Sequence, residues 1–149
     1  MYQLNLPQFE IKISKQNGKT YVFDILRKKY IAITPEEWVR QHFIHFLIEH
    51  KGYPASLLIN ETELTIGNKK LRCDSLLYAT DGTPRMIIEY KAPYIPLTEK
   101  VFNQIYAYNL ILKADYLIIS NGMQHITCKV DYKNNKYVFL KEIPDYKAL

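Results

Sequence analysis

The chain has 149 residues, of which 48% are hydrophobic and 23% are charged, which fits one globular domain with its own core. A formal net charge of +5 suits a polyanionic partner. Its only cysteines, Cys73 and Cys128, are too few for a disulfide framework or a four-cysteine zinc site. No leader-like segment opens the chain and no apolar run approaches the roughly 20 residues of a membrane span, so we expect a cytoplasmic protein without membrane contact.

The first segment predicts a β-hairpin. Two runs that alternate apolar and polar residues, 9–14 and 21–25, flank Asn17-Gly18, a dipeptide that favours tight turns because both residues tolerate positive φ. The tripeptide Gly18–Thr20 resembles the end of a phosphate-binding loop, but Ile13 stands where that loop needs a glycine. The chain therefore carries no ATPase signature of its own.

An amphipathic helix is predicted directly after Thr34, which is a suitable N-cap and precedes a proline. Glu36 and Glu37 lie in its first turn, where carboxylates stabilise the positive end of the helix dipole. Glu36 precedes Val39 and Phe43 at helical spacing, so we expect it on the buried stripe and Glu37 further round. The alternative is that both glutamates serve only the helix N-terminus.

The remaining elements are three strands, a second helix, one fully apolar strand and a final hairpin, at residues 56–66, 70–79, 84–93, 98–113, 114–122 and 125–144. The simplest arrangement of the three strands is an antiparallel meander. The order predicts an α/β fold in which a mixed central sheet is flanked by two main helices, with an N-terminal β-hairpin. We divide the single domain 1–149 into an N-terminal hairpin extension at 1–33, a core at 34–131, and a C-terminal hairpin strand and tail at 132–149.

Three charged residues interrupt the apolar strands. Side chains alternate along a strand, so Glu89 and Lys91 share one face while Tyr90 takes the other. If the strands pair through the turn at 81–82, Asp74 lies beside Glu89, and two such carboxylates repel unless a cation joins them. Mg²⁺ takes one or two carboxylates with water and phosphate oxygens, and a nearby lysine can orient an attacking water. The alternative is that Glu89 and Lys91 face solvent and Asp74 pairs with Arg72.

Four stretches together, TPEEWVRQ, RCDSLL, IIEYKAP and NQIYAY, resemble the PD-(D/E)xK nuclease superfamily. The resemblance is greatest to the N-terminal domain of type I restriction enzyme R subunits in a stand-alone form, and it covers residues 34–129. It implies a restriction-endonuclease-like core and a metal-dependent endonuclease that hydrolyses DNA phosphodiester bonds with Mg²⁺, or Mn²⁺ in its place, without the ATPase motor of those subunits. The alternative is a non-cleaving module that binds nucleic acid or a protein partner.

The resemblance also implies roles for particular residues. Asp74 and Glu89 would be metal ligands, with the backbone carbonyl of Tyr90 as a further ligand, and Lys91 would be the catalytic lysine. The acidic residue of the first helix corresponds to Glu36, with Glu37 as the less favoured register.

The second helix would add Gln104 and Tyr108, which match a Gln-x-x-x-Tyr element placed beside the active site in some members. At the position before Asp74, Cys73 replaces the proline of the motif, which leaves the carboxylate in place.

The implied partner is DNA, in duplex form, with a homodimer or separate protein partners as further options. Candidate contacts to nucleic acid are the basic residues near the implied site, together with one tyrosine: Lys69, Lys70, Arg72, Lys100 and Tyr108. Further basic candidates are Lys113, Arg27, Lys28 and Lys29. Together such residues would give salt-dependent, sequence-independent affinity.

Overall fold

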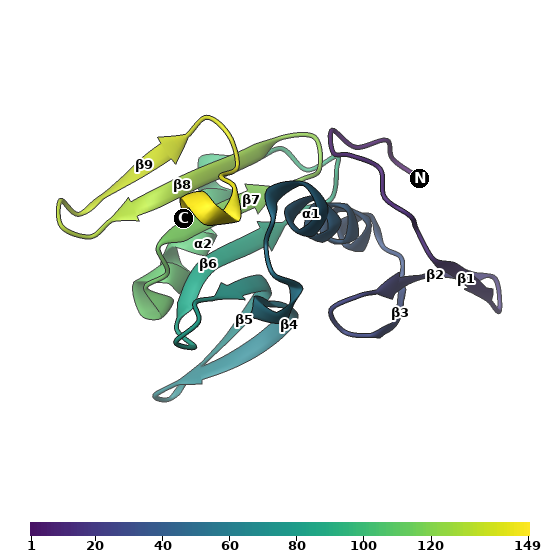
Figure 1. The fold of residues 1–149 in the computed structure, drawn as a ribbon, viewed down its shortest axis with the longest axis horizontal. Coiled ribbons are helices and arrows are strands. Elements are labelled where there is room, and N and C mark those ends of the chain that lie inside the picture. The colour runs from purple at the N-terminus through teal and green to yellow at the C-terminus, as the bar shows by residue number, and fades with distance from the viewer.

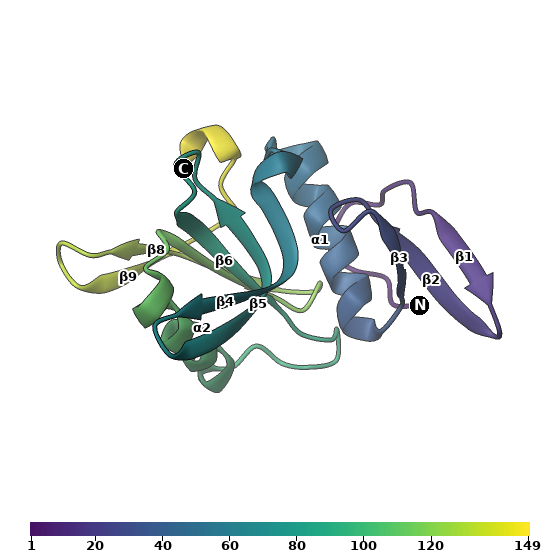
Figure 2. The same ribbon diagram turned by 90° about the horizontal axis from the view of Figure 1, so that it is seen from below.

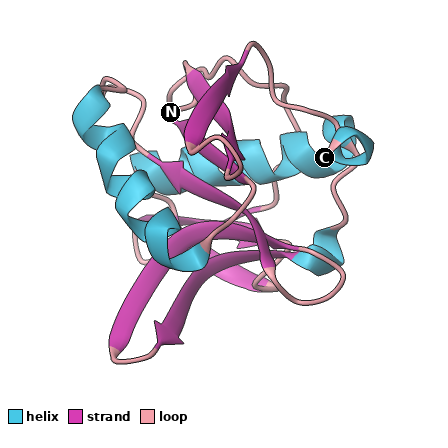
Figure 3. Ribbon diagram, turned by 90° about the vertical axis from the view of Figure 1, so that its left-hand side faces the viewer, coloured by secondary structure: helices cyan, strands magenta, loops and turns pink.

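The computed structural model describes residues 1–149 and contains two sheets and two long helices (Figure 1). Most of the chain lies in regular elements, and the longer loops lie at the periphery (Figure 3). No helix is both long enough and apolar enough to cross a membrane. The elements are, in chain order, β1 Ile13–Gln16, β2 Lys19–Asp24, β3 Lys29–Ala32, α1 Pro35–Lys51, η1 Ala55–Leu57, β4 Leu58–Ile66, β5 Lys69–Tyr78, β6 Pro84–Tyr90, α2 Glu99–Leu112, β7 Tyr116–Ser120, β8 His125–Asp131, β9 Lys136–Leu140 and η2 Tyr146–Ala148.

The strands β1, β2 and β3 form a separate antiparallel sheet, which we call the N-terminal sheet. The predicted hairpin at Asn17-Gly18 is present, and β3 extends it by pairing with β2. The turn from β2 to β3 places Lys28 at φ +54°, in the left-handed region. Glycine is the usual residue in this region, so a turn built on a lysine gives no signal in the sequence.

Both predicted helices are confirmed, and their first residues follow a threonine. The hydroxyl of Thr34 accepts the backbone N–H of Glu37 at 3.0 Å, which satisfies one of the free donors at the start of α1. Gly52, at φ +73°, ends this helix in the left-handed conformation that favours glycine. Thr98 stands at the N-cap position of α2 but makes no side-chain bond to the helix.

The main sheet has the strand order β4-β5-β6-β7-β8-β9. The first three strands form the predicted antiparallel meander, and β8 and β9 form the predicted final hairpin. Only β6 and β7 are parallel, and α2 makes the connection between them. The predicted α/β class, a mixed sheet flanked by two helices, is confirmed.

The two helices pack on opposite faces of this sheet (Figure 2). Alternation along β6 divides its side chains between two cores. Met86 and Ile88 pack with Val39 and Phe43 of α1, whereas Ile87 packs with Ile105 of α2. This burial on both faces anchors β6, so its last residues have a fixed place beside the start of α1.

Candidate active site

Two of the predicted carboxylates stand side by side on β5 and β6. The antiparallel register pairs Ser75 with Ile88, and Asp74 and Glu89 are the neighbouring residues on the two strands, close enough for Asp74 to shift the pKa of Glu89. Asp74 accepts the backbone N–H of Tyr90 at 2.9 Å, which fixes its carboxylate at the end of β6. Only 8% of Glu89 is exposed, so the two acidic groups meet in a largely buried place.

Lys91 completes a group that we call the carboxylate site: Asp74, Glu89 and Lys91. The Lys91 Nζ lies 3.8 Å from the Glu89 Oε1 and donates to the Gln104 Oε1 at 3.4 Å. Gln104 comes from α2, so the helix and the sheet both hold the ammonium at the rim of the site. The second residue of the Gln-x-x-x-Tyr element, Tyr108, packs against the core beneath α2.

The carboxylate site concentrates negative charge in a largely buried environment. Burial, and then the charge of Asp74, raise the pKa of the Glu89 carboxyl to about 8, and Lys91 offsets only part of this effect. Burial and the charge of Asp74 also raise the pKa of Glu36 above its ordinary value. The surroundings therefore disfavour ionisation of Glu89 and Glu36, as expected for cation ligands without a cation.

The two glutamates at the start of α1 are buried and exposed in the opposite sense to the one that helical spacing predicts. Glu37 is 5% exposed, whereas the side chain of Glu36 is 47% exposed, so the expectation of a buried Glu36 and an outward Glu37 was wrong. The reason is tertiary, because the turn between β2 and β3 folds over α1 and brings Arg27 against Glu37. Glu36 instead faces the carboxylate site, near enough for Asp74 to shift its pKa.

A second charged cluster, which we call the paired network, lies between the N-terminal sheet, α1 and β4. Its members are charged and amide side chains that are bonded to one another: Asp24, Arg27, Glu37, Arg40, Gln41 and Asn60. Both oxygens of Asp24 are bonded, since Oδ1 accepts two backbone N–H groups and Oδ2 accepts Arg27, Gln41 and Asn60.

Arg40 joins the paired network to the carboxylate site. Its guanidinium pairs with Glu37 and also lies 3.5 Å from Asp74 and 4.0 Å from Glu36, while it stacks over the ring of Tyr90. Arg40 was not among the predicted site residues. The sequence feature that could have revealed it is an arginine within the apolar stripe of α1, four residues after Glu36 and three after Glu37.

The alternative in which Asp74 pairs with Arg72 is wrong. Arg72 bonds Glu61 at 3.3 Å, and Asp74 faces Arg40 instead. Glu89 is buried, so it is also not a solvent-facing residue at a strand end. The three charged side chains of the carboxylate site therefore form one cluster.

The oxygen donors at this place fit Mg²⁺ in number and kind. Two carboxylates with water and phosphate oxygens are its usual ligands, and a cation would neutralise the charge that raises the pKa of Glu89. No group of three or more His, Cys, Asp or Glu side chains is close enough together to hold a metal ion. The predicted third carboxylate ligand, Glu36, does not form a group of three with Asp74 and Glu89 in this structure.

The basic candidates for nucleic-acid contact differ in what they already bind. Lys69 and Lys100 are exposed and make no ion pair, whereas Lys70 pairs with Glu63 at 3.6 Å. Arg27 bonds Asp24, Glu37 and Glu61, so its guanidinium is fully engaged inside the protein. Arg27 is therefore not available to contact nucleic acid.

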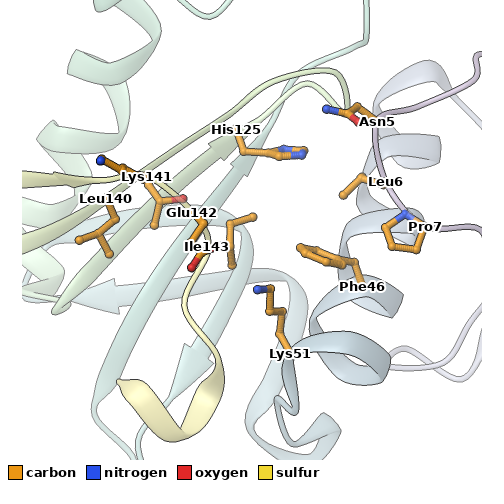
Figure 4. A pocket seen from close by; sticks show the side chains of 11 residues that line it. Asn5, Leu6, Pro7, Phe46, Lys51, His125, Leu140, Lys141, Glu142 and Ile143 are labelled. Carbon is orange, nitrogen blue, oxygen red and sulfur yellow. The ribbon is translucent and has the colours of Figure 1, made fainter.

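A cavity of about 300 Å³ lies away from these residues, between the N-terminal segment, α1 and the segment after β9 (Figure 4). Lys51, Phe46 and His125 point toward it. The Nδ1 of His125 is 2.8 Å from the hydroxyl of Ser120, but this serine is fully buried and also accepts the backbone N–H of Gly122. A hydroxyl held in this way serves the fold.

The fold and the site together define a mixed α/β domain that carries a buried carboxylate pair with a lysine at its rim. Residues 35–144 match the family described as Type I restriction enzyme R protein N terminus (HSDR_N), and the chain belongs to that family.

A solved fragment from Vibrio vulnificus YJ016, assigned as the HsdR subunit of a type I restriction enzyme, has the same fold. The two share 21% sequence identity at a TM-score of 0.55, over 75% of this chain and 24% of that chain. The chain thus spans about a quarter of the length of that structure. No curated protein matches the chain in sequence.

Proposed function

We propose that this protein is a metal-dependent nuclease that hydrolyses phosphodiester bonds of DNA at the carboxylate site. The observation that carries the proposal is the buried pair of Asp74 and Glu89, whose mutual repulsion a divalent cation would relieve. Membership in a family named for restriction enzymes supports DNA as the substrate.

Each residue of the site has a task in this proposal. Asp74 and Glu89 would hold Mg²⁺ directly, with the backbone carbonyl of Tyr90, and Glu36 would act through a water. When bound, the cation supplies Lewis-acid stabilisation of the phosphoryl group.

As an ammonium at the rim, Lys91 would orient the attacking water and stabilise charge on the phosphate, and only as a neutral amine would it accept a proton from that water. Gln104 holds that ammonium in place.

The test is cleavage of supercoiled plasmid in Mg²⁺ or Mn²⁺, with a chelator as blank. We expect Asp74→Asn, Glu89→Gln and Lys91→Met each to lower the cutting rate at least about 100-fold, because each removes a charge that acts on the metal or the phosphate. Asp81→Asn, which changes an exposed carboxylate on the turn after β5, should cut as wild type does. Unchanged cutting by all three variants would show that the carboxylate site is not the active site.

A second candidate function is a module on the same fold that binds nucleic acid or a protein partner without cutting. The observation that favours it is that Glu36 does not group with Asp74 and Glu89 as a third carboxylate. Retained binding of DNA by wild-type protein, with no cleavage in either metal, would select this candidate.

A further inference from the structure

The N-terminal sheet has one face that packs on the protein and one that does not. Val22 and Asp24 point toward α1 and are fully buried. Because side chains alternate, Tyr21 and Phe23 of β2 point the other way, and cross-strand pairing adds Tyr30 opposite Phe23. Figure 2 shows α1 beside this sheet and no further element on its far side.

Aromatic rings and lysines alternate on this outward face. The rings of Phe23 and Tyr30 are 5.3 Å apart, and 48% of Tyr30 is exposed. The Nζ of Lys12 lies 5.9 Å above the ring of Phe23, and Lys19 stands two residues before Tyr21 on the same side of β2. A solvent-facing sheet surface usually carries polar residues, so three aromatic residues here need an explanation.

The charge around these rings has a single sign. Between residues 11 and 33 the only acidic residue is Asp24, which is buried and bonded to Arg27. The exposed charges of this segment are all lysines, and none makes an ion pair: Lys12, Lys15, Lys19, Lys28 and Lys29. A second copy of this face would be repelled, whereas a polyanion would be attracted.

We propose that the outward face of the N-terminal sheet binds a single-stranded stretch of nucleic acid. The exposed ring of Tyr30, with the half-buried ring of Phe23 beside it, can stack on unpaired bases while lysines neutralise the backbone, and this combination is typical of sequence-independent single-strand binding. The face lies outside residues 35–144, which match the family. The choice of nucleic acid over other polyanions draws on the proposed nuclease function.

The N-terminal sheet is also held in a fixed relation to the carboxylate site. Arg27, in the turn after β2, bonds Glu37, and Glu37 bonds Arg40, whose guanidinium lies 3.5 Å from Asp74. A strand bound on the outward face would therefore be tethered at a defined position relative to the site, and would not be free to move about it.

The experiment measures binding of a fluorescein-labelled, mixed-sequence single-stranded oligodeoxynucleotide by fluorescence anisotropy. All proteins carry Asp74→Asn, so that no cutting disturbs the measurement. We expect Tyr30→Ser to weaken binding roughly tenfold, because one stacking ring is lost, and Tyr30→Phe to bind as the parent does. Lys12→Gln with Lys19→Gln should lower the slope of log K against log salt by about 1.4, since each lysine contributes about 0.7 on a single strand.

The matched controls lie on β9 and its turn, where another exposed ring and two exposed lysines stand far from the N-terminal sheet in the sequence. Phe139→Ser, and Lys133→Gln with Lys136→Gln, should leave the affinity unchanged. Equal losses on both surfaces, or no loss at Tyr30, would overturn the inference. A loss of self-association in light scattering, without a loss of oligonucleotide binding, would make the face a protein interface and also overturn it.

The outcomes separate this inference from the proposed function. Plasmid cutting that depends on Asp74, combined with oligonucleotide binding that is indifferent to Tyr30, removes only the inference. Absent cutting combined with Tyr30-dependent binding removes only the nuclease.

Discussion

The protein contains two buried clusters of charge that share Arg40 yet differ in how their charges are balanced. In the paired network, the carboxylate of Asp24 meets a guanidinium, two side-chain amides and two backbone N–H groups. In the carboxylate site, Asp74 and Glu89 face each other, and Lys91 is 3.8 Å away at the rim. In the first cluster each carboxylate is paired within the chain, whereas in the second two carboxylates face one another with a single ammonium nearby.

The pKa values of the two clusters move in opposite directions for this reason. Burial raises the pKa of Asp24, but hydrogen bonds from Arg27 and Asn60 outweigh it, so the pKa lies below the ordinary 3.8. For Glu89, burial and the charge of Asp74 act together and raise the pKa to about 8. Charges that serve the fold are neutralised within it, whereas charges that serve a ligand stay costly until the ligand arrives.

The largest effect is expected from a break in the paired network. Asp24→Ala should lower the free energy of unfolding by about 3–5 kcal/mol, because it removes one of the three carboxylates paired with Arg27 and leaves buried backbone and amide donors unbonded. Urea denaturation measures this loss. Asp131→Ala, which removes an exposed carboxylate that bonds Asn134 in the turn after β8, should have a much smaller effect. Equal effects would mean that Asp24 does not anchor the N-terminal sheet.

In the carboxylate site, removal of a carboxylate is expected to raise the folding stability. Glu89→Gln should stabilise the metal-free protein by a few kcal/mol at alkaline pH, since each pH unit of pKa displacement corresponds to about 1.4 kcal/mol. The raised pKa means that the folded wild type holds a proton that the unfolded chain has lost. Wild-type stability from this group is full below pH 4.5 and is lost as pH rises through about 8.

The measurement is thermal unfolding in chelator across that pH range. The two stability curves should separate progressively between pH 4.5 and about 8, with Glu89→Gln above wild type. Glu36→Gln should show a weaker separation, because its side chain is half exposed. Parallel curves for Glu89→Gln and wild type would show that the carboxylate site is balanced as the paired network is.

The two clusters also differ in how well the sequence predicts them. Asp74, Glu89 and Lys91 lie in one meander, so the local pattern brings them near one another, but the register of β5 on β6 shifts between Leu77 and Tyr78 and does not follow from the short turn alone. The paired network joins Arg27, Glu37 and Asn60 across three elements, and nothing in local periodicity reports such contacts. A tertiary contact also explains why Glu37 is buried and Glu36 is not. The turn between β2 and β3 folds over α1 and covers Glu37, which the helical spacing of apolar residues does not predict.

Arg40 belongs to both clusters, so its replacement tests whether they act separately. Arg40→Lys keeps the charge but loses the planar fork that reaches Glu37 and Asp74 together. We expect Mn²⁺ affinity, measured by calorimetry, to fall about 10- to 100-fold, as is typical when a group that positions a metal ligand is changed.

Arg72→Lys, at an exposed arginine that bonds Glu61, is the matched control and should retain Mn²⁺ affinity. A loss of folding stability in Arg40→Lys, with intact Mn²⁺ affinity, would assign Arg40 to the paired network alone.

The smallest effect is expected where charges belong to neither cluster. Lys69→Gln with Lys100→Gln should leave the free energy of unfolding within about 0.5 kcal/mol, because both lysines are exposed and make no ion pair. If both contact duplex phosphates, the slope of log K against log salt for duplex binding should fall by about 1.8. Lys70→Gln, whose lysine already pairs with Glu63, should lower the slope less. A slope unchanged in the double variant would place the duplex elsewhere on the surface, since a free lysine that touches a phosphate must release a counterion.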